Sequence, residues 1–154
     1  MAQVAIGLGT NLGDREKNML TAVALLAERA GTILALSALY ETEPWGFESE
    51  NPFFNAALIL ETELSPLDLL LLTQRIEREM GRVEKSSGTY HDRLIDIDLL
   101  LYDDIVLESP LLMLPHPLMH QRKFVLQPLE EIAPGWIHPV LKEPVARLYA
   151  KLSF

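Results

Sequence analysis

The sequence predicts an α+β protein in which helices pack on an antiparallel sheet. Short apolar segments typical of strands alternate with two longer segments whose apolar residues recur at helical spacing. The chain has 154 residues, of which 49% are hydrophobic and 23% charged, as in one globular domain. We therefore expect residues 1–154 to form a single domain that buries its own core.

Three strands and one helix are predicted in the first half of the chain. Residues 2–8 alternate weakly and end in glycines, which is typical of a strand. A helix follows Asp14, an acidic residue that suits the positive end of the helix dipole, and it ends at Gly31. Residues 32–42 and 53–63 are rich in β-forming residues and are the second and third strands.

The second half continues with a helix and a fourth strand. Ser65 is a favoured N-cap, and the helix that it begins runs to Met80. Residues 95–102 are dense in Ile and Leu and predict a strand. Asp103–Asp104 then predicts a hairpin turn into residues 105–107.

The order of these elements is βαββαβ, which is the ferredoxin-like arrangement. Such a fold has an antiparallel sheet with its helices on one face. A C-terminal extension with a hairpin follows, and helices are expected at residues 122–132 and 144–151. The fold by itself does not indicate a function.

Composition excludes several classes of protein. The chain has no cysteine, so it has neither disulfides nor a thiolate metal site, which suits the cytoplasm. Its net charge of −9 argues against broad contact with nucleic acid or an anionic membrane. Residues 1–6 lack a basic leader, and no apolar run approaches the roughly 18 residues of a membrane span. A nucleotide held by a local arginine cluster remains possible.

Asp96 and Asp98 interrupt the apolar fourth strand. Side chains two residues apart on a strand point to the same face and lie roughly 6.5 to 7 Å apart along the chain. That separation suits a pair of metal ions about 3.5 to 4 Å apart, as in phosphoryl-transfer sites. Arg93 stands just upstream. The alternative is a half-exposed strand with two aspartates on its polar face, and the pair alone does not exclude it.

Aromatic residues gather around the loop between the second and third strands. Phe53 and Phe54 must point to opposite faces of a strand, so one of them is free to stack on a flat ring. Asn55 offers a paired donor and acceptor to such a ligand. Packing of all the aromatics beneath the loop is an equally good explanation from sequence alone.

Charged residues cluster at the end of the second helix and in the loop over residues 82–92. A solvated helix face is the usual explanation, and an anion-binding edge is the functional one. His116 lies between two prolines, and Arg122 follows six residues later. A lone histidine is more often structural than catalytic.

Together these motifs resemble the 6-hydroxymethyl-7,8-dihydropterin pyrophosphokinase family over nearly the whole chain. The segments that carry the resemblance are Gly9-Thr10-Asn11-Leu12-Gly13-Asp14, Thr42-Glu43-Pro44-Trp45-Gly46, Phe53-Phe54-Asn55-Ala56, Gln74-Arg75-Ile76-Glu77, Gly81-Arg82, Arg93 with Asp96-Ile97-Asp98, Leu114-Pro115-His116-Pro117, and Arg122 with Phe124. Phe53 stands where tyrosine is common in the family, and Leu111 stands where some members have a basic residue.

The resemblance implies that the enzyme transfers the β,γ-diphosphate of ATP to the pterin hydroxymethyl oxygen and releases AMP, a step of folate biosynthesis. Asp96 and Asp98 would hold two Mg²⁺ ions, while Arg82 and Arg93 would stabilise phosphate charge. The implied ATP-binding residues are Gln74, Glu77, Lys85, Leu99, His116 and Arg122. The implied pterin-binding residues are Thr42, Glu43, Trp45, Phe53, Asn55 and Phe124. We expect a cytoplasmic monomer that binds these small molecules and neither nucleic acid nor membrane.

Two other classes share part of this pattern. A Mg²⁺-dependent nucleotidyl transferase on a ferredoxin-like palm would share the aspartate pair, but it would not need the aromatic and asparagine segment. A non-catalytic binding module would need neither the two aspartates nor the arginines, and an RNA-binding one would want a basic surface.

Overall fold

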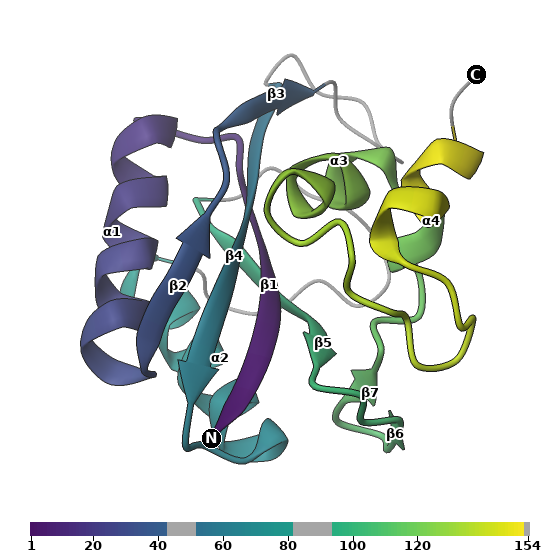
Figure 1. Cartoon of the computed structure of the whole chain (residues 1–154). Helices are drawn as coiled ribbons and strands as arrows, with labels where there is room; N and C mark the ends of the chain where they lie inside the picture. Colours follow the sequence, from purple (N-terminus) through teal and green to yellow (C-terminus); the bar gives the residue numbers. More distant parts are fainter. Residues whose placement is uncertain (43–51, 82–93, 153–154) are drawn as a thin grey trace.

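The computed structural model describes residues 1–42, 52–81 and 94–152 (Figure 1). The strands are β1 (Ala2–Thr10), β2 (Thr32–Leu36), β3 (Tyr40–Thr42), β4 (Phe53–Thr62), β5 (Asp96–Tyr102), β6 (Leu107–Glu108) and β7 (Met113–Leu114). The helices are α1 (Arg15–Arg29), α2 (Pro66–Glu79), the 3₁₀ turn Met119–Gln121, α3 (Lys123–Ile132) and α4 (Val145–Lys151). None of these helices is long and apolar enough to cross a membrane.

Five strands form one antiparallel sheet, in which β1 lies between β4 and β5 (Figure 1). β2 and β3 pair with successive parts of β4 on its other edge. The predicted α+β class with an antiparallel sheet is therefore confirmed. The Asp14 carboxylate caps α1 by accepting a hydrogen bond from the Lys17 N–H at 3.0 Å. Ser65 caps α2 in the same way through the Asp68 N–H at 3.2 Å.

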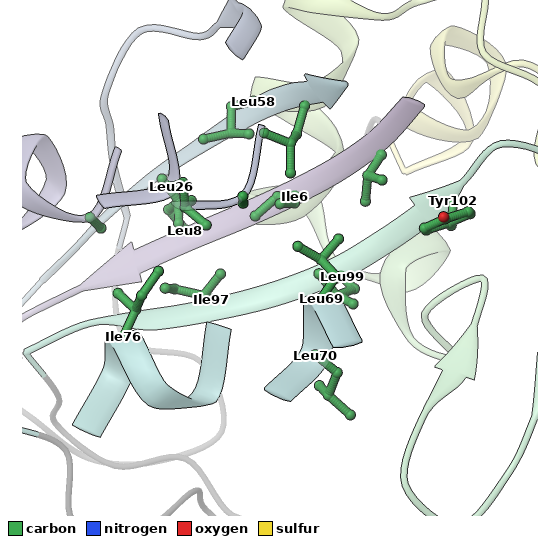
Figure 2. Close-up of a cluster of buried hydrophobic side chains, with 14 of the residues drawn as sticks. Ile6, Leu8, Leu26, Leu58, Leu69, Leu70, Ile76, Ile97, Leu99 and Tyr102 are labelled. Carbon is green, nitrogen blue, oxygen red and sulfur yellow. The ribbon is translucent and has the colours of Figure 1, made fainter. Parts of the chain in front are cut away.

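One face of the sheet packs on α1 and α2. Val4, Ile6 and Leu8 of β1 alternate onto this face and are almost completely buried. Figure 2 shows Ile6 and Leu8 beside Leu26 of α1, with further leucines and isoleucines of α2 and β5 around them. This cluster is the main core of the protein.

The other face packs on α3 and α4, the helices of the C-terminal extension, whose place on the sheet the sequence analysis did not predict. Ala5 and Ala57 lie on this face with Leu126 and Leu129 of α3 in a second buried cluster. Their small side chains let a helix approach the sheet closely. Both faces of β1 are therefore buried, which explains why its polar and apolar residues alternate only weakly.

The predicted strand over residues 32–42 is two strands, separated at Ser37. The Ser37 hydroxyl accepts a hydrogen bond from the Ala57 N–H at 2.9 Å and donates to the Ala38 carbonyl at 2.8 Å. A side chain thus takes part in the ladder where the backbone leaves it. The chain then rejoins β4 as β3.

The predicted turn at Asp103–Asp104 is present, but the hairpin after it is not. Asp103 adopts a positive φ of 47°, and its carboxylate accepts a hydrogen bond from the Gln3 N–H at 2.9 Å. The following strand, β6, pairs with β7 rather than turning back on β5. The turn is therefore hydrogen-bonded to β1, and the chain leaves the main sheet after it.

Candidate active site

A pocket of about 570 Å³, including the open space at its mouth, lies on the sheet face that also carries α3. Parts of β1, β3, β4 and β5 form its floor and sides, and the start of α3 closes it. The lining residues are Gly7, Leu8, Gly9, Thr42, Phe53, Asn55, Ala56, Asp96, Asp98, Leu100, Arg122, Phe124 and Val125. Seven of the predicted site residues therefore meet in one cavity, although they come from four separate segments.

Asp96 and Asp98 both line the pocket and are half-buried. Ile97, between them, points into the main core and is 1% exposed. The strand alternation predicted from the sequence therefore holds at this pair. The Ile97 N–H donates a hydrogen bond of 2.8 Å to the Glu77 carboxylate of α2, so the helix holds the strand between its two aspartates.

Gly7 and Gly9 of β1 face the aspartates across the sheet, with Gly9 opposite Asp96 and Gly7 opposite Asp98. A Cβ atom on Gly9 would lie 3.3 Å from the Asn55 Oδ1 atom, and one on Gly7 would lie 3.4 Å from Leu100. The missing side chains keep the pocket floor open. The sequence analysis did not identify this role, which glycines two residues apart in a strand would have indicated.

Phe53 and Phe54 point to opposite faces of β4, as the strand period requires. Phe53 lines the pocket, whereas Phe54 packs against the main core. The loop over residues 43–51 lies outside the described residues, so the alternative in which all the aromatics pack beneath it stays open. Trp45 and Glu43 lie outside the described residues.

The side-chain amide of Asn55 is almost completely buried, and a neighbour fixes its orientation. Its Nδ2 atom donates a hydrogen bond of 2.6 Å to the Thr42 Oγ1 atom on β3. The Oδ1 atom then turns toward Gly9. Asn55 and Thr42 therefore form a small polar unit at the side of the cavity.

Arg122 and Phe124 come from the start of α3. The Arg122 guanidinium carbon lies 5.7 Å from the centre of the Phe124 ring. Arg122 is 8% exposed, and burial lowers its pKa from the ordinary arginine value. A guanidinium removed from water favours an anionic ligand beside it.

Four other predicted site residues lie away from this lining. Leu99 points into the main core, on the opposite face of β5 from the aspartates, so its side chain does not face the pocket. Glu77 is 2% exposed and contacts the β5 backbone, and Gln74 is half-buried on the same helix. His116 lies at a separate pocket with His120 and His138. Its backbone N–H donates to the Leu100 carbonyl at 2.9 Å, which ties this segment to β5.

Arg82, Lys85 and Arg93 lie outside the described residues. Within the described parts of the chain, no group of three or more His, Cys, Asp or Glu side chains is arranged to hold a metal ion.

Residues 5–134 match the family model of 7,8-dihydro-6-hydroxymethylpterin-pyrophosphokinase, or HPPK. The chain belongs to the HPPK family. It is 53% identical to the 2-amino-4-hydroxy-6-hydroxymethyldihydropteridine pyrophosphokinase of Porphyromonas gingivalis, over 94% of this chain and 99% of that protein. It is 43% identical to the Aquifex aeolicus enzyme of the same name, over 94% of this chain and 89% of that one.

The fold is also that of solved HPPK domains. The Plasmodium falciparum HPPK-DHPS structure has a TM-score of 0.78 and 19% identity, and it covers 97% of this chain. This chain spans 43% of that longer protein. The chain is a pyrophosphokinase, which transfers pyrophosphate from ATP to hydroxymethyldihydropterin in folate biosynthesis. Membership of this family excludes the nucleotidyl transferase and the non-catalytic binding module.

Proposed function

We propose that the pocket between β1, β5 and α3 is where the pterin and the transferred diphosphate of ATP meet. The observation that carries this proposal is the shared cavity of the aspartate pair, the two phenylalanines and Asn55. One wall is anionic, another is aromatic, and the buried Arg122 also lines the cavity. These are the three properties that a metal-bound phosphate chain and a flat heterocycle require.

Asp96 and Asp98 would hold two Mg²⁺ ions. Both are oxygen ligands on one face of a strand, and the chain has no cysteine, so the donor set fits a hard cation. When bound, the ions neutralise phosphate charge and orient the triphosphate. Arg82 and Arg93 would add positive charge to the same phosphates. No side chain is needed as a covalent nucleophile.

The reaction in this pocket is an in-line displacement. The pterin hydroxymethyl oxygen attacks the β-phosphorus of ATP, and the bond from that phosphorus to the α,β-bridging oxygen breaks. AMP leaves, the β,γ-diphosphate stays on the pterin, and the hydroxyl proton passes to solvent. The protein contributes mainly by holding the two oxygens in line and by excluding water.

The pterin ring would stack between Phe53 and Phe124. Asn55 and Thr42 would read its hydrogen-bonding edge, and Glu43 and Trp45 would complete that edge. Gln74, Lys85, His116 and Arg122 would help to seat ATP. Glu77 and Leu99 would act on ATP through the β5 backbone, because their side chains point away from the pocket.

Phe53→Ala and Phe124→Ala test the pterin site. We expect each to weaken pterin binding by roughly 1 to 3 kcal/mol, the range for stacking of a base on an aromatic ring, while ATP binding changes much less. Titration calorimetry with each ligand separately measures the two affinities. Leu34→Ala, at an exposed side chain of β2 outside the pocket lining, is the control. Equal losses for both ligands would contradict the stacking role.

We also propose that this single domain works as a monomer in the cytoplasm. The absence of cysteine and the acidic net charge support that assignment. Light scattering at assay concentration measures the mass of the particle, and a dimer would contradict the monomer. Cell fractionation tests the compartment.

A further inference from the structure

Among the described residues, the side chain of Arg15, at the first position of α1, makes three contacts outside the pocket. Its Nη1 atom donates a hydrogen bond of 2.8 Å to the Pro52 carbonyl. The same atom lies 3.1 Å from the Glu41 carboxylate. Its guanidinium carbon lies 4.0 Å from the centre of the Phe54 ring. One side chain thus joins α1 to two strands of the sheet.

The three partners of Arg15 lie at the shared end of β3 and β4. Glu41 of β3 pairs directly with Phe54 of β4, and Pro52 immediately precedes β4. Residues opposite each other in an antiparallel pair point to the same face of the sheet. The Glu41 and Phe54 side chains therefore lie on the same face of the sheet, where Arg15 contacts both at the outer margin of the main core.

The neighbouring pairs on the same two strands contribute residues to the pocket. Thr42 pairs with Phe53, and both line it; Tyr40 pairs with Asn55, of which Asn55 lines it. The hydrogen bond from Asn55 to Thr42 joins these strands on the pocket side. Arg15 and the polar unit thus hold the same short stretch of sheet from opposite faces.

We propose that Arg15 is a positioning residue for the pterin, which it fixes through the backbone of β3 and β4 without touching it. β3 has only three residues, so its own ladder supplies few hydrogen bonds. Arg15 adds a bond to the Pro52 carbonyl, an ion pair and a stacked guanidinium at the strand end. This inference rests on the pterin roles proposed above for Phe53, Asn55 and Thr42.

Arginine suits this position better than lysine. A planar guanidinium can stack on an aromatic ring while its edge donates to a carbonyl and a carboxylate. A lysine ammonium is a compact charge on a flexible stem, so it can keep the ion pair but not the stacked geometry. The proposal therefore predicts a graded loss from arginine to lysine to glutamine.

Arg15→Gln should raise the Kd and KM for the pterin by roughly three- to tenfold, the range for losing a cation–π contact together with a charged hydrogen bond. ATP affinity should change by less than about twofold, since ATP would bind toward β5 and α3. Arg15→Lys should give an intermediate pterin affinity. The Asn55 side-chain amide resonance should shift in Arg15→Gln, because its bond to Thr42 depends on the strand position.

Arg29→Gln is the matched control, since it removes an exposed ion pair with Glu79 at the other end of α1. It should leave both affinities unchanged. Phe54→Leu keeps an apolar core contact but removes the stacked ring, and it provides a second test if Arg15→Gln folds poorly. Unchanged pterin affinity in Arg15→Gln or in Phe54→Leu, or equal losses for pterin and ATP, would overturn the proposal.

Phe53→Ala, measured in the same series, distinguishes a failure of the proposed pterin site from a failure of the proposed role of Arg15. If it weakens pterin binding while the Arg15 variants do not, the positioning role alone is wrong. If it has no effect on pterin binding, the pterin site and the role of Arg15 are both overturned.

Discussion

Gly7 and Gly9 lie opposite Asp98 and Asp96 in the sheet, and all four residues line the pocket. The chemistry of the pocket comes from charged and aromatic residues, while the two glycines add no side chain to its floor. The spacing of the aspartates was readable from the sequence because a strand repeats every two residues. The same repeat places Leu99 on the opposite face, so its assignment to ATP rested on the family resemblance alone.

Asp96→Asn or Asp98→Asn should reduce AMP formation by about a hundredfold or more, because each removes a charged ligand for an ion whose effect is worth several kcal/mol. The fold should survive, since both carboxylates are only half-buried. An assay for AMP with ATP, Mg²⁺ and pterin measures the rate, and thermal unfolding checks the fold. Asp104→Asn, in the exposed turn after β5, is the control. A near-wild-type rate in either variant would rule out the metal assignment.

Gly9→Ala should weaken pterin binding by about tenfold, since the new Cβ would lie 3.3 Å from Asn55 and 3.7 Å from Phe53. Asn55 lines the pocket, so its Oδ1 atom must move by a few tenths of an ångström to make room, whereas Phe53 lies at an ordinary van der Waals distance. Calorimetric titration with the pterin checks the loss. Gly135→Ala is the matched control, because no atom would lie within 4 Å of its Cβ. Equal behaviour of the two variants would show that the pocket floor tolerates a methyl group.

At the scale of elements, α3 is joined to the β2–β3 junction by one carboxylate. Glu131 accepts hydrogen bonds from the Ala38 N–H at 3.1 Å and from the Tyr40 hydroxyl at 2.5 Å. The hydrogen bond from the Tyr40 hydroxyl to Glu131, together with burial and the charge of Glu131, raises the pKa of Tyr40 to about 12. One end of α3 thus contacts β3, while the other end supplies Arg122 and Phe124 to the pocket.

This link predicts a pH dependence of stability. The pKa of Tyr40 is higher in the folded than in the unfolded protein. The contribution of this side chain to the free energy of unfolding is therefore fully present below the unfolded pKa of about 10. The contribution is lost as the pH rises from there through about 12. The free energy of unfolding of the wild type should therefore fall more steeply over that range than that of Tyr40→Phe. Urea unfolding at several alkaline pH values measures the difference, and parallel slopes would contradict it.

Most elements could be predicted because their signals are local. The caps at Asp14 and Ser65 and the apolar spacing of α1 and α2 involve only neighbouring residues. The break at Ser37 could not be predicted, since the hydroxyl that interrupts the strand bonds to Ala57 on a different strand. The pairing of β6 with β7 was missed for a similar reason, because a turn at Asp103 does not specify the partner of the strand after it.

At the scale of the whole molecule, the sheet lies between two layers of helices, α1 with α2 on one face and α3 with α4 on the other (Figure 1). The sequence predicted the helices of both layers, but it did not place α3 and α4 on the second face of the sheet. Small residues such as Ala5 and Ala57 mark the second interface, and they give little hydrophobic signal. The pocket wall from α3 was therefore predictable only through the resemblance of Arg122 and Phe124 to family motifs.

The second layer should be necessary for both stability and binding. Leu129→Ala removes a fully buried side chain between α3 and the sheet, and it should cost about 2 to 5 kcal/mol in the free energy of unfolding. Pterin affinity should fall with it, because α3 carries Phe124. Urea unfolding and pterin titration measure the two effects. Leu34→Ala, at a side chain that is 46% exposed on β2, is the control. A cost under about 1 kcal/mol would show that α3 is not held by this cluster.

The central place of β1 has a consequence for how the chain is made. Its pairing partners run from Phe54 to Thr62 and from Asp96 to Tyr102, far later in translation. In a nascent chain, one edge of β1 therefore has no pairing partner until the ribosome has released β5. Phe124, at the start of α3, emerges later still. Contacts between such distant segments slow folding relative to local ones. The Asp96 and Asp98 carboxylates thus reach their places in the same late event that completes the sheet.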